Sequence, residues 1–246
     1  MSESYHALCN DFYVNQKLVL KMELPRARET VLDLFERVRR QFPSMAGFRR
    51  FKDEYALESP QSDMPHRWAA MRGNCIRSGT VNPPQIAEAY TLHQHLLEIA
   101  PTYLSISALD VDFLELLYGF DLVAGGNHDA IVHDALLSGS PLAAITDVPG
   151  AGLIECQPMV GLSLGEGVEA FFEVKTRGPQ HPMRDPDAGD PISVFVTLRR
   201  AGPISDVRDL PCALRSLAKR GEELVQQRVI PGLLVPIREA IASGNA

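Results

Sequence analysis

Residues 125–134, GGNHDAIVHD, are the stretch in which side chains of the right types for chemistry stand closest together. They contain two His-Asp pairs, His128 with Asp129 and His133 with Asp134. Imidazole nitrogens and carboxylate oxygens bind zinc, manganese and iron, and a metal ion held in this way can activate water for hydrolysis. The pattern therefore raises the hypothesis of a metal-dependent phosphohydrolase.

The letters Gly-Asn-His-Asp resemble one metal-binding turn of the calcineurin-like phosphoesterases, and the two pairs are similar to those of the HD phosphohydrolases. The first resemblance implies two metal ions, which also need D-x-H, G-D-x-x-D and G-H-x-H motifs. The chain has no D-x-H, no G-D-x-x-D before residue 125 and no G-H-x-H after it. The second resemblance implies an all-helical domain, whereas strand patterns flank these pairs. Each resemblance covers only a few residues.

The start of a helix explains the same letters. Asn127 is a good N-cap, because its side-chain oxygen accepts bonds from the free backbone N–H groups of a first turn. The two glycines before it permit a sharp entry. Asp129 complements the positive end of the helix and stands four residues before His133, where the two can pair. The sequence thus predicts a helix that begins here and binds no metal ion or cofactor.

Composition places the chain among ordinary globular proteins, since 45% of its 246 residues are hydrophobic and 22% are charged. A net charge of −7 argues against nucleic acid or an anionic membrane as a partner. The four cysteines are too widely spaced for a shared metal or redox motif and are expected to be free. With no signal-like N-terminus and no apolar run of membrane length, the expected location is cytoplasmic.

Residues 1–102 predict a first α+β half. Periodicity and turn signals give, in order, a strand, a helix, two strands that form a hairpin, a second helix that begins at Asn82, and a short closing strand. This order, β-α-β-β-α-β, is the split βαβ pattern of ferredoxin-like folds. The first helix is expected at residues 25–42. The strands are expected at residues 10–24, 47–59, 66–81 and 103–111.

Residues 103–246 predict a second, similar half in the order β-α-β-β-β-α with a long C-terminal helix from about Asp209, interrupted at Pro231 and Pro236. The recurrence of Asp-Phe at residues 11–12 and 112–113 is a weak indication of internal duplication. The strands are expected at residues 111–125, 153–164, 169–177 and 191–200. The overall prediction is an α+β fold of two ferredoxin-like halves with mainly antiparallel sheets.

The strand at residues 111–125 is apolar on both faces, with Phe113 and Leu117 on one of them. A sheet with helices on only one side would leave that face bare. We therefore expect the two halves to pack on each other, with a homodimer as the alternative.

Charged side chains on the predicted strands form the candidate binding site. Because successive strand residues alternate between faces, residues 173, 175 and 177 share one face, and a neighbouring strand adds residue 199. The first half contributes an arginine and the single tryptophan. The candidate site residues are Arg67, Trp68, Glu173, Lys175, Arg177 and Arg199.

Two classes of function follow. The first is a non-catalytic binding or assembly module for a small anionic ligand or a protein partner, favoured because no complete catalytic motif is present. The second is a metal-dependent phosphohydrolase that uses the pairs at residues 128–134. Bound metal, lost when both histidines are replaced, would distinguish them.

Overall fold

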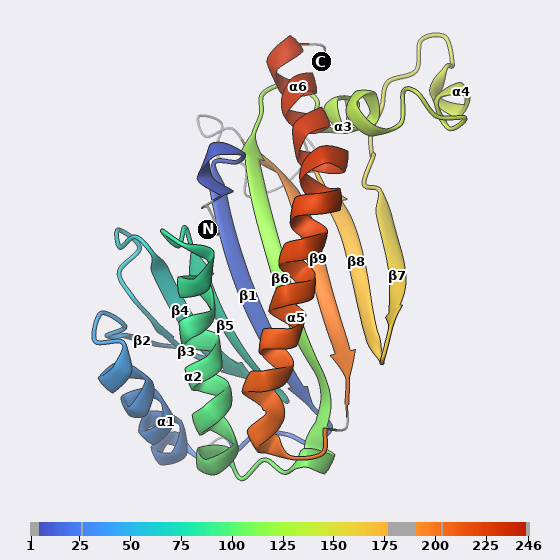
Figure 1. The fold of residues 1–246 in the computed structure, drawn as a ribbon. Helices are drawn as coiled ribbons and strands as arrows, with labels where there is room; N and C mark the ends of the chain where they lie inside the picture. Colours follow the sequence, from blue (N-terminus) through green and yellow to red (C-terminus); the bar gives the residue numbers. More distant parts are fainter. Residues whose placement is uncertain (1–4, 26, 177–189, 203, 245–246) are drawn as a thin grey trace.

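Nine antiparallel strands form one sheet in the computed structural model, which describes residues 5–25, 27–176, 190–202 and 204–244 (Figure 1). The strand order is β2-β3-β4-β5-β1-β6-β9-β8-β7. The strands are β1 (Asp11–Leu20), β2 (Gly47–Arg50), β3 (Glu54–Glu58), β4 (His66–Arg72), β5 (Cys75–Val81), β6 (Val111–Val123), β7 (Met159–Gly165), β8 (Val168–Lys175) and β9 (Pro191–Ala201).

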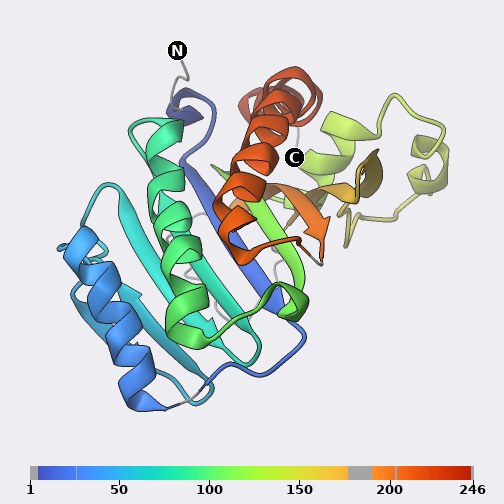
Figure 2. The ribbon, with the colours of Figure 1, turned by 60° about the horizontal axis from the view of Figure 1, so that its bottom comes forward.

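Helices cover one face of this sheet. Helix α1 (Arg28–Gln41) buries a stripe at residues 31, 34, 35 and 38, as its period predicts, and lies beside α2 (Ile86–Leu104), which crosses β5 and β1 (Figure 2). Helix α5 (Leu210–Leu224) crosses β6 and β9. In the described part of the chain, no helix has the length and apolar character that crossing a membrane requires.

The C-terminal helix is long, as predicted, and changes its winding instead of breaking. Helix α5 continues into a π-helical segment, Val225–Leu234, and then into α6 (Val235–Ser243). Pro231 lies inside the π-helical segment, and Pro236 lies in the first turn of α6, where a missing N–H is tolerated. The wider winding accommodates a proline that an α-helix would not accept without a kink.

Both ends of the sheet are built in the same order along the chain. Helix α1 connects β1 to the far edge strand β2, and the chain returns through β3, β4 and β5 to lie beside β1. After β6, α3 (His128–Leu136) and α4 (Ala143–Thr146) lead to the other edge strand β7, and the chain returns through β8 and β9 to lie beside β6. The sheet is continuous because β1 pairs with β6.

Four predicted strands differ from the structure, and the one expected at residues 153–164 begins only at Met159. Residues 47–59 and 66–81 each form two strands joined by a turn, so β2 to β5 replace one hairpin. Residues 103–111, predicted as a closing strand, contain the end of α2 and a short 3-10 turn, Ala108–Asp110. The helix stops at Ser105, which takes the left-handed conformation at φ 53° and ends α2 in place of a glycine.

The expectation that the two halves pack face to face was wrong. Strand β6 is an inner strand of the sheet, and its neighbours are β1 and β9. One of its faces is buried beneath α5, and the other, with Phe113 and Leu117, is partly exposed. The side chains of neighbouring strands, and not a second layer, shield that face.

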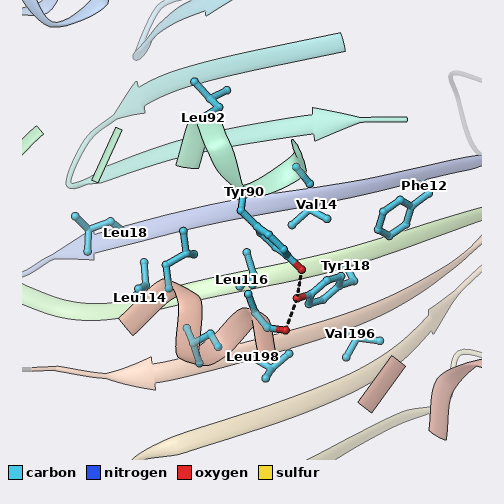
Figure 3. Packing of buried hydrophobic residues seen from close by; sticks show 14 of the residues in the cluster. Phe12, Val14, Leu18, Tyr90, Leu92, Leu114, Leu116, Tyr118, Val196 and Leu198 are labelled. Atoms are coloured by element: carbon cyan, nitrogen blue, oxygen red, sulfur yellow. Dashed lines mark hydrogen bonds between the residues drawn. The ribbon is translucent and has the colours of Figure 1, made fainter. Parts of the chain in front are cut away.

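The core beneath the helices contains a buried tyrosine cluster (Figure 3). The side chain of Tyr118 in β6 is 0% exposed, and its hydroxyl lies 2.8 Å from that of Tyr90 in α2 and 3.1 Å from the Ala218 carbonyl oxygen. Tyr90 also donates to Glu222 at 2.9 Å. Burial raises the pKa of both tyrosines. Gly221 of α5 leaves the space into which the Tyr118 ring fits.

A second set of buried, hydrogen-bonded polar side chains connects α2 to β1 and β5. The Gln16 amide donates to Ser78 Oγ at 3.0 Å, and Ser78 donates to His93 Nδ1 at 2.7 Å. His93 Nε2 completes the chain by donating to the Val14 carbonyl oxygen at 3.2 Å. Because a carbonyl can only accept, the ring proton is on Nε2. His93 is 0% exposed, and burial lowers its pKa to about 3, so the ring is neutral in the folded protein.

Candidate binding face of the sheet

The face of the sheet opposite the helices, here called the open face, is the candidate functional site. In the part of the chain that the structure describes, the helices that pack on the sheet lie on one side of it (Figures 1 and 2). Strand alternation sends Phe12 and Val14 of β1 towards the helices and turns Tyr13, Asn15 and Lys17 to the open face. A solvent-facing sheet surface is usually polar, whereas this one includes aromatic side chains from five strands.

Two aromatic rings lie flat on the open face because glycine is beneath them. A Cβ atom on Gly79 would come within 2.2 Å of the Trp68 ring nitrogen, and one on Gly119 within 2.1 Å of the Tyr13 ring. Tyr13 also meets Phe195 of β9, with ring centroids 6.4 Å apart. Glycine at these two positions creates aromatic platforms that any side chain would lift from the sheet.

Charged side chains cross the centre of the open face in one register row. In the strand register, Arg77 of β5 lies opposite Lys17 of β1, and Lys17 lies opposite Glu115 of β6. Glu115 in turn lies opposite Arg199 of β9. Arg199 donates to Glu115 at 2.8 Å and stacks on Phe113, with its guanidinium carbon 4.5 Å from the ring centroid. Lys17 lies over the same ring at 5.7 Å. Arg199 is therefore held by a ring face as well as by a carboxylate.

Four of the six predicted site residues lie on the open face. Trp68 and Arg199 take the positions described above. Lys175 of β8 pairs with Glu173 at 3.2 Å and lies over Phe195 at 5.7 Å. Trp68, in β4, lies on one half of this sheet surface, whereas Arg199, Glu173 and Lys175, in β9 and β8, lie on the other half. Arg177 is outside the described residues.

The placement of Arg67 with Trp68 was wrong. The two residues are adjacent in β4, so their side chains leave opposite faces of the sheet. Arg67 points to the helix side, where its guanidinium carbon lies 5.7 Å from the Phe42 ring centroid and its Nη2 lies 3.9 Å from Glu88. Its side chain lines a pocket between the end of α1 and the start of α2.

Sequence reasoning missed the aromatic half of the open face, namely Tyr13, Phe113, Phe171 and Phe195. The alternation of β1 puts Tyr13 on the face opposite Phe12, and of the adjacent residues Phe171 and Phe172 in β8 one must lie on each face. That signal was available. The stacking of Tyr13 on Gly119 was not, because it depends on the register between β1 and β6.

The His-Asp stretch begins a helix, as predicted. The Asn127 side-chain oxygen accepts from the backbone N–H groups of Asp129 at 3.0 Å and Ala130 at 3.2 Å, and α3 starts at His128. The Asn127 amide nitrogen donates to the Leu153 carbonyl oxygen at 3.0 Å. Asn127 therefore caps α3 and also fastens the chain segment that leads to β7.

The two His-Asp pairs do not converge. Asp129 is buried and accepts from the Cys156 backbone N–H and the Thr176 hydroxyl, so the expected pairing with His133 was wrong. His128 donates to the Ala124 carbonyl oxygen at 2.9 Å, and His133 lies 3.0 Å from the Thr146 hydroxyl. Within the described residues, no group of three or more His, Cys, Asp or Glu side chains is arranged to hold a metal ion.

Replacement of Asn127 by alanine is expected to lower the free energy of unfolding by about 0.5–2 kcal/mol, because two first-turn N–H groups lose their acceptor. Asn127→Asp keeps an acceptor oxygen but loses the bond to Leu153, so its loss should be smaller. Urea unfolding of both variants measures the difference.

The same unfolding experiments with added zinc or manganese test the metal hypothesis. No stabilisation of the wild-type protein is expected, because the positive end of a helix repels cations. Stabilisation by metal that disappears in His128→Ala would overturn the capping interpretation.

One pair of side chains of a catalytic type occurs in the core and not on the open face. Ser78 and His93 form a hydroxyl–imidazole pair at hydrogen-bonding distance, but both side chains are 0% exposed and no substrate can reach them. All four cysteines are free, and burial raises the pKa of the Cys9 thiol to about 12, which keeps it protonated. Comparison of the chain with models of known protein families, and with curated proteins, finds no match.

Proposed function

We propose that this protein is a non-catalytic binding module whose open face docks a protein partner. One observation carries the proposal, namely an aromatic and aliphatic centre on a sheet face that no described helix covers. The centre comprises Tyr13, Trp68, Phe113, Leu117, Phe171 and Phe195, each only partly buried. Aromatic residues and arginine are enriched in the buried centres of protein interfaces.

A protein surface suits this face better than the small anion that the charges alone suggested. The guanidinium groups of Arg77 and Arg199 are already paired with Glu54 and Glu115. A small anion would have to compete with those carboxylates, whereas a protein surface can pack on the rings and leave the ion pairs intact. The expected partner is apolar where it meets Tyr13 and Phe195, and polar at its rim.

The single tryptophan makes the proposal testable, because Trp68 lies on the open face and its fluorescence reports that face alone. Peptides selected from a random displayed library on the wild-type protein are titrated against it while Trp68 emission is recorded. We expect binding to shift the emission. In Phe195→Ala the affinity should fall about tenfold, as for the loss of one central aromatic contact.

Phe51→Ala is the matched control. Phe51 is 54% exposed and lies between β2 and β3, away from the aromatic centre, so its loss should leave peptide affinity unchanged. Peptides that bind without changing Trp68 emission, or that bind Phe195→Ala as tightly as wild type, would refute the proposal. A library that yields no binder would also count against it.

We also infer that the two halves, residues 1–102 and 103–246, arose by internal duplication. The inference is supported by the shared order of a strand, a helical connection to an edge strand, a return through antiparallel strands, and a final helix. Superposition of β1 to α2 on β6 to α5 tests it. Equivalent strands and both final helices should align in one rotation, and failure of α2 to fall on α5 would contradict the inference.

A further inference from the structure

The two edges of the sheet are built differently. Edge strand β2 is short and contains Arg49 and Arg50, and charged residues of this kind prevent an edge from pairing with another chain. Edge strand β7 has the sequence MVGLSLG, with no charged residue and no proline. Its outer side pairs with no other described strand. β7 thus lacks the usual protection of an exposed edge.

Exposed hydrophobic side chains gather at this edge. Met159, Val160 and Leu162 of β7 are 63%, 55% and 46% exposed, and lie on both faces of the strand. The connection from α3 to β7, which leads into this edge strand in Figure 1, exposes more such side chains. These are Leu142, Ile145, Val148 and Ile154. Such a concentration marks an interaction surface.

We propose that β7 pairs antiparallel with β7 of a second copy of this chain. The resulting two-fold dimer would join two nine-stranded sheets into one. The strand suits its own copy because neutral residues face neutral residues in any antiparallel register, whereas two β2 strands could bring arginine opposite arginine. A two-fold interface uses the same surface on both partners, and this edge supplies apolar side chains and free backbone groups to each.

The geometry of such a dimer places both open faces on the same side. A two-fold axis that makes two edge strands antiparallel is perpendicular to the sheet, so it does not turn one sheet over. The two aromatic centres would then form one extended surface, and a partner with two contact sites would gain avidity. The dimer is nevertheless independent of the function proposed for the open face.

Light scattering during size-exclusion chromatography tests the proposal. We expect the wild-type protein to have twice the 27.1 kDa mass of the chain, and the double variant Val160→Lys and Leu162→Lys to have the single mass. Both side chains are exposed, so the variant should fold, which its thermal melt checks. Leu109→Lys is the control. Leu109 is 76% exposed and lies in the 3-10 turn before β6, away from β7, so the protein with this substitution should remain dimeric.

Hydrogen exchange locates the contact. Amides of β7 that point away from β8 should exchange slowly in the wild-type dimer and at least tenfold faster in the double lysine variant. A wild-type protein that is monomeric at all concentrations tested would overturn the proposal. So would a dimer that survives both lysines, or one without protection in β7. Phe195→Ala should keep the dimer while it loses peptide binding, so failure of one proposal is distinct from failure of the other.

Discussion

Replacement of Gly221 by alanine is expected to lower the free energy of unfolding by about 1–3 kcal/mol, the usual range for overpacking a filled core. A Cβ atom at this position of α5 would lie 2.4 Å from a ring carbon of Tyr118 and 2.8 Å from its hydroxyl oxygen. Tyr118 cannot turn away, because it is fully buried and its hydroxyl is held by Tyr90 and Ala218. Either the ring leaves its hydrogen bonds or α5 moves away from the sheet.

Gly232→Ala is the matched control, because Gly232 lies in the same C-terminal helix and a Cβ atom there would meet nothing within 4 Å. Alanine is favoured over glycine in helices by up to about 1 kcal/mol, so this variant should be as stable as wild type or more stable. Urea unfolding of both variants gives the comparison. Equal stability of Gly221→Ala and the wild-type protein would contradict the described fit of Tyr118 against α5.

Acid is expected to destabilise the protein through His93. Burial lowers the pKa of this histidine to about 3 in the folded state, whereas an exposed histidine in the unfolded chain has a pKa of about 6.5. Between these two values the unfolded chain binds a proton that the folded protein does not, so stability falls as the pH falls. The loss approaches about 1.4 kcal/mol per pH unit, or about 2–3 kcal/mol between neutral pH and pH 4.5.

The contribution of His93 is measured as a difference, because carboxylates also titrate in acid. Unfolding free energies of wild type and His93→Gln are recorded from pH 7 to pH 4. The glutamine can accept from Ser78 and donate to Val14 but has no proton to gain. Its stability should fall less steeply than that of wild type. Parallel curves for wild type and His93→Gln would contradict the prediction.

The local sequence pattern was sufficient to predict a strand or helix that has one buried side. The alternation of β1 and the period of α1 each give one buried side, as the structure has it. Asn127 was predictable as a cap because capping depends only on the next three residues. The hairpin turns were harder. The turn at Gly73 contains a glycine at φ 57°, a signal that could have divided residues 66–81, whereas the turn at residues 51–53 contains neither glycine nor proline.

Long-range features were not predictable from one sequence. The apolar second face of β6 suggested a covering layer, but Phe113 is shielded by the long side chains of Lys17 and Arg199 from the neighbouring strands. Those neighbours follow from sheet order, and no local period determines sheet order. The candidate site also has a part that local pattern predicts and a part that depends on strand register. Alternation placed Glu173 and Lys175 correctly, but only the register across β1 and β6 creates the Tyr13 platform.

The pairing of β1 with β6 also determines when the first half can be completed during protein synthesis. Strand β1 leaves the ribosome before its partner β6, which follows about a hundred residues later, and synthesis of that interval takes about 5–20 seconds at usual translation rates. In that interval β5 can satisfy only one side of β1, and the other side displays unpaired backbone groups. Translation speed and chaperone access in those seconds therefore affect how much of the newly made chain escapes aggregation.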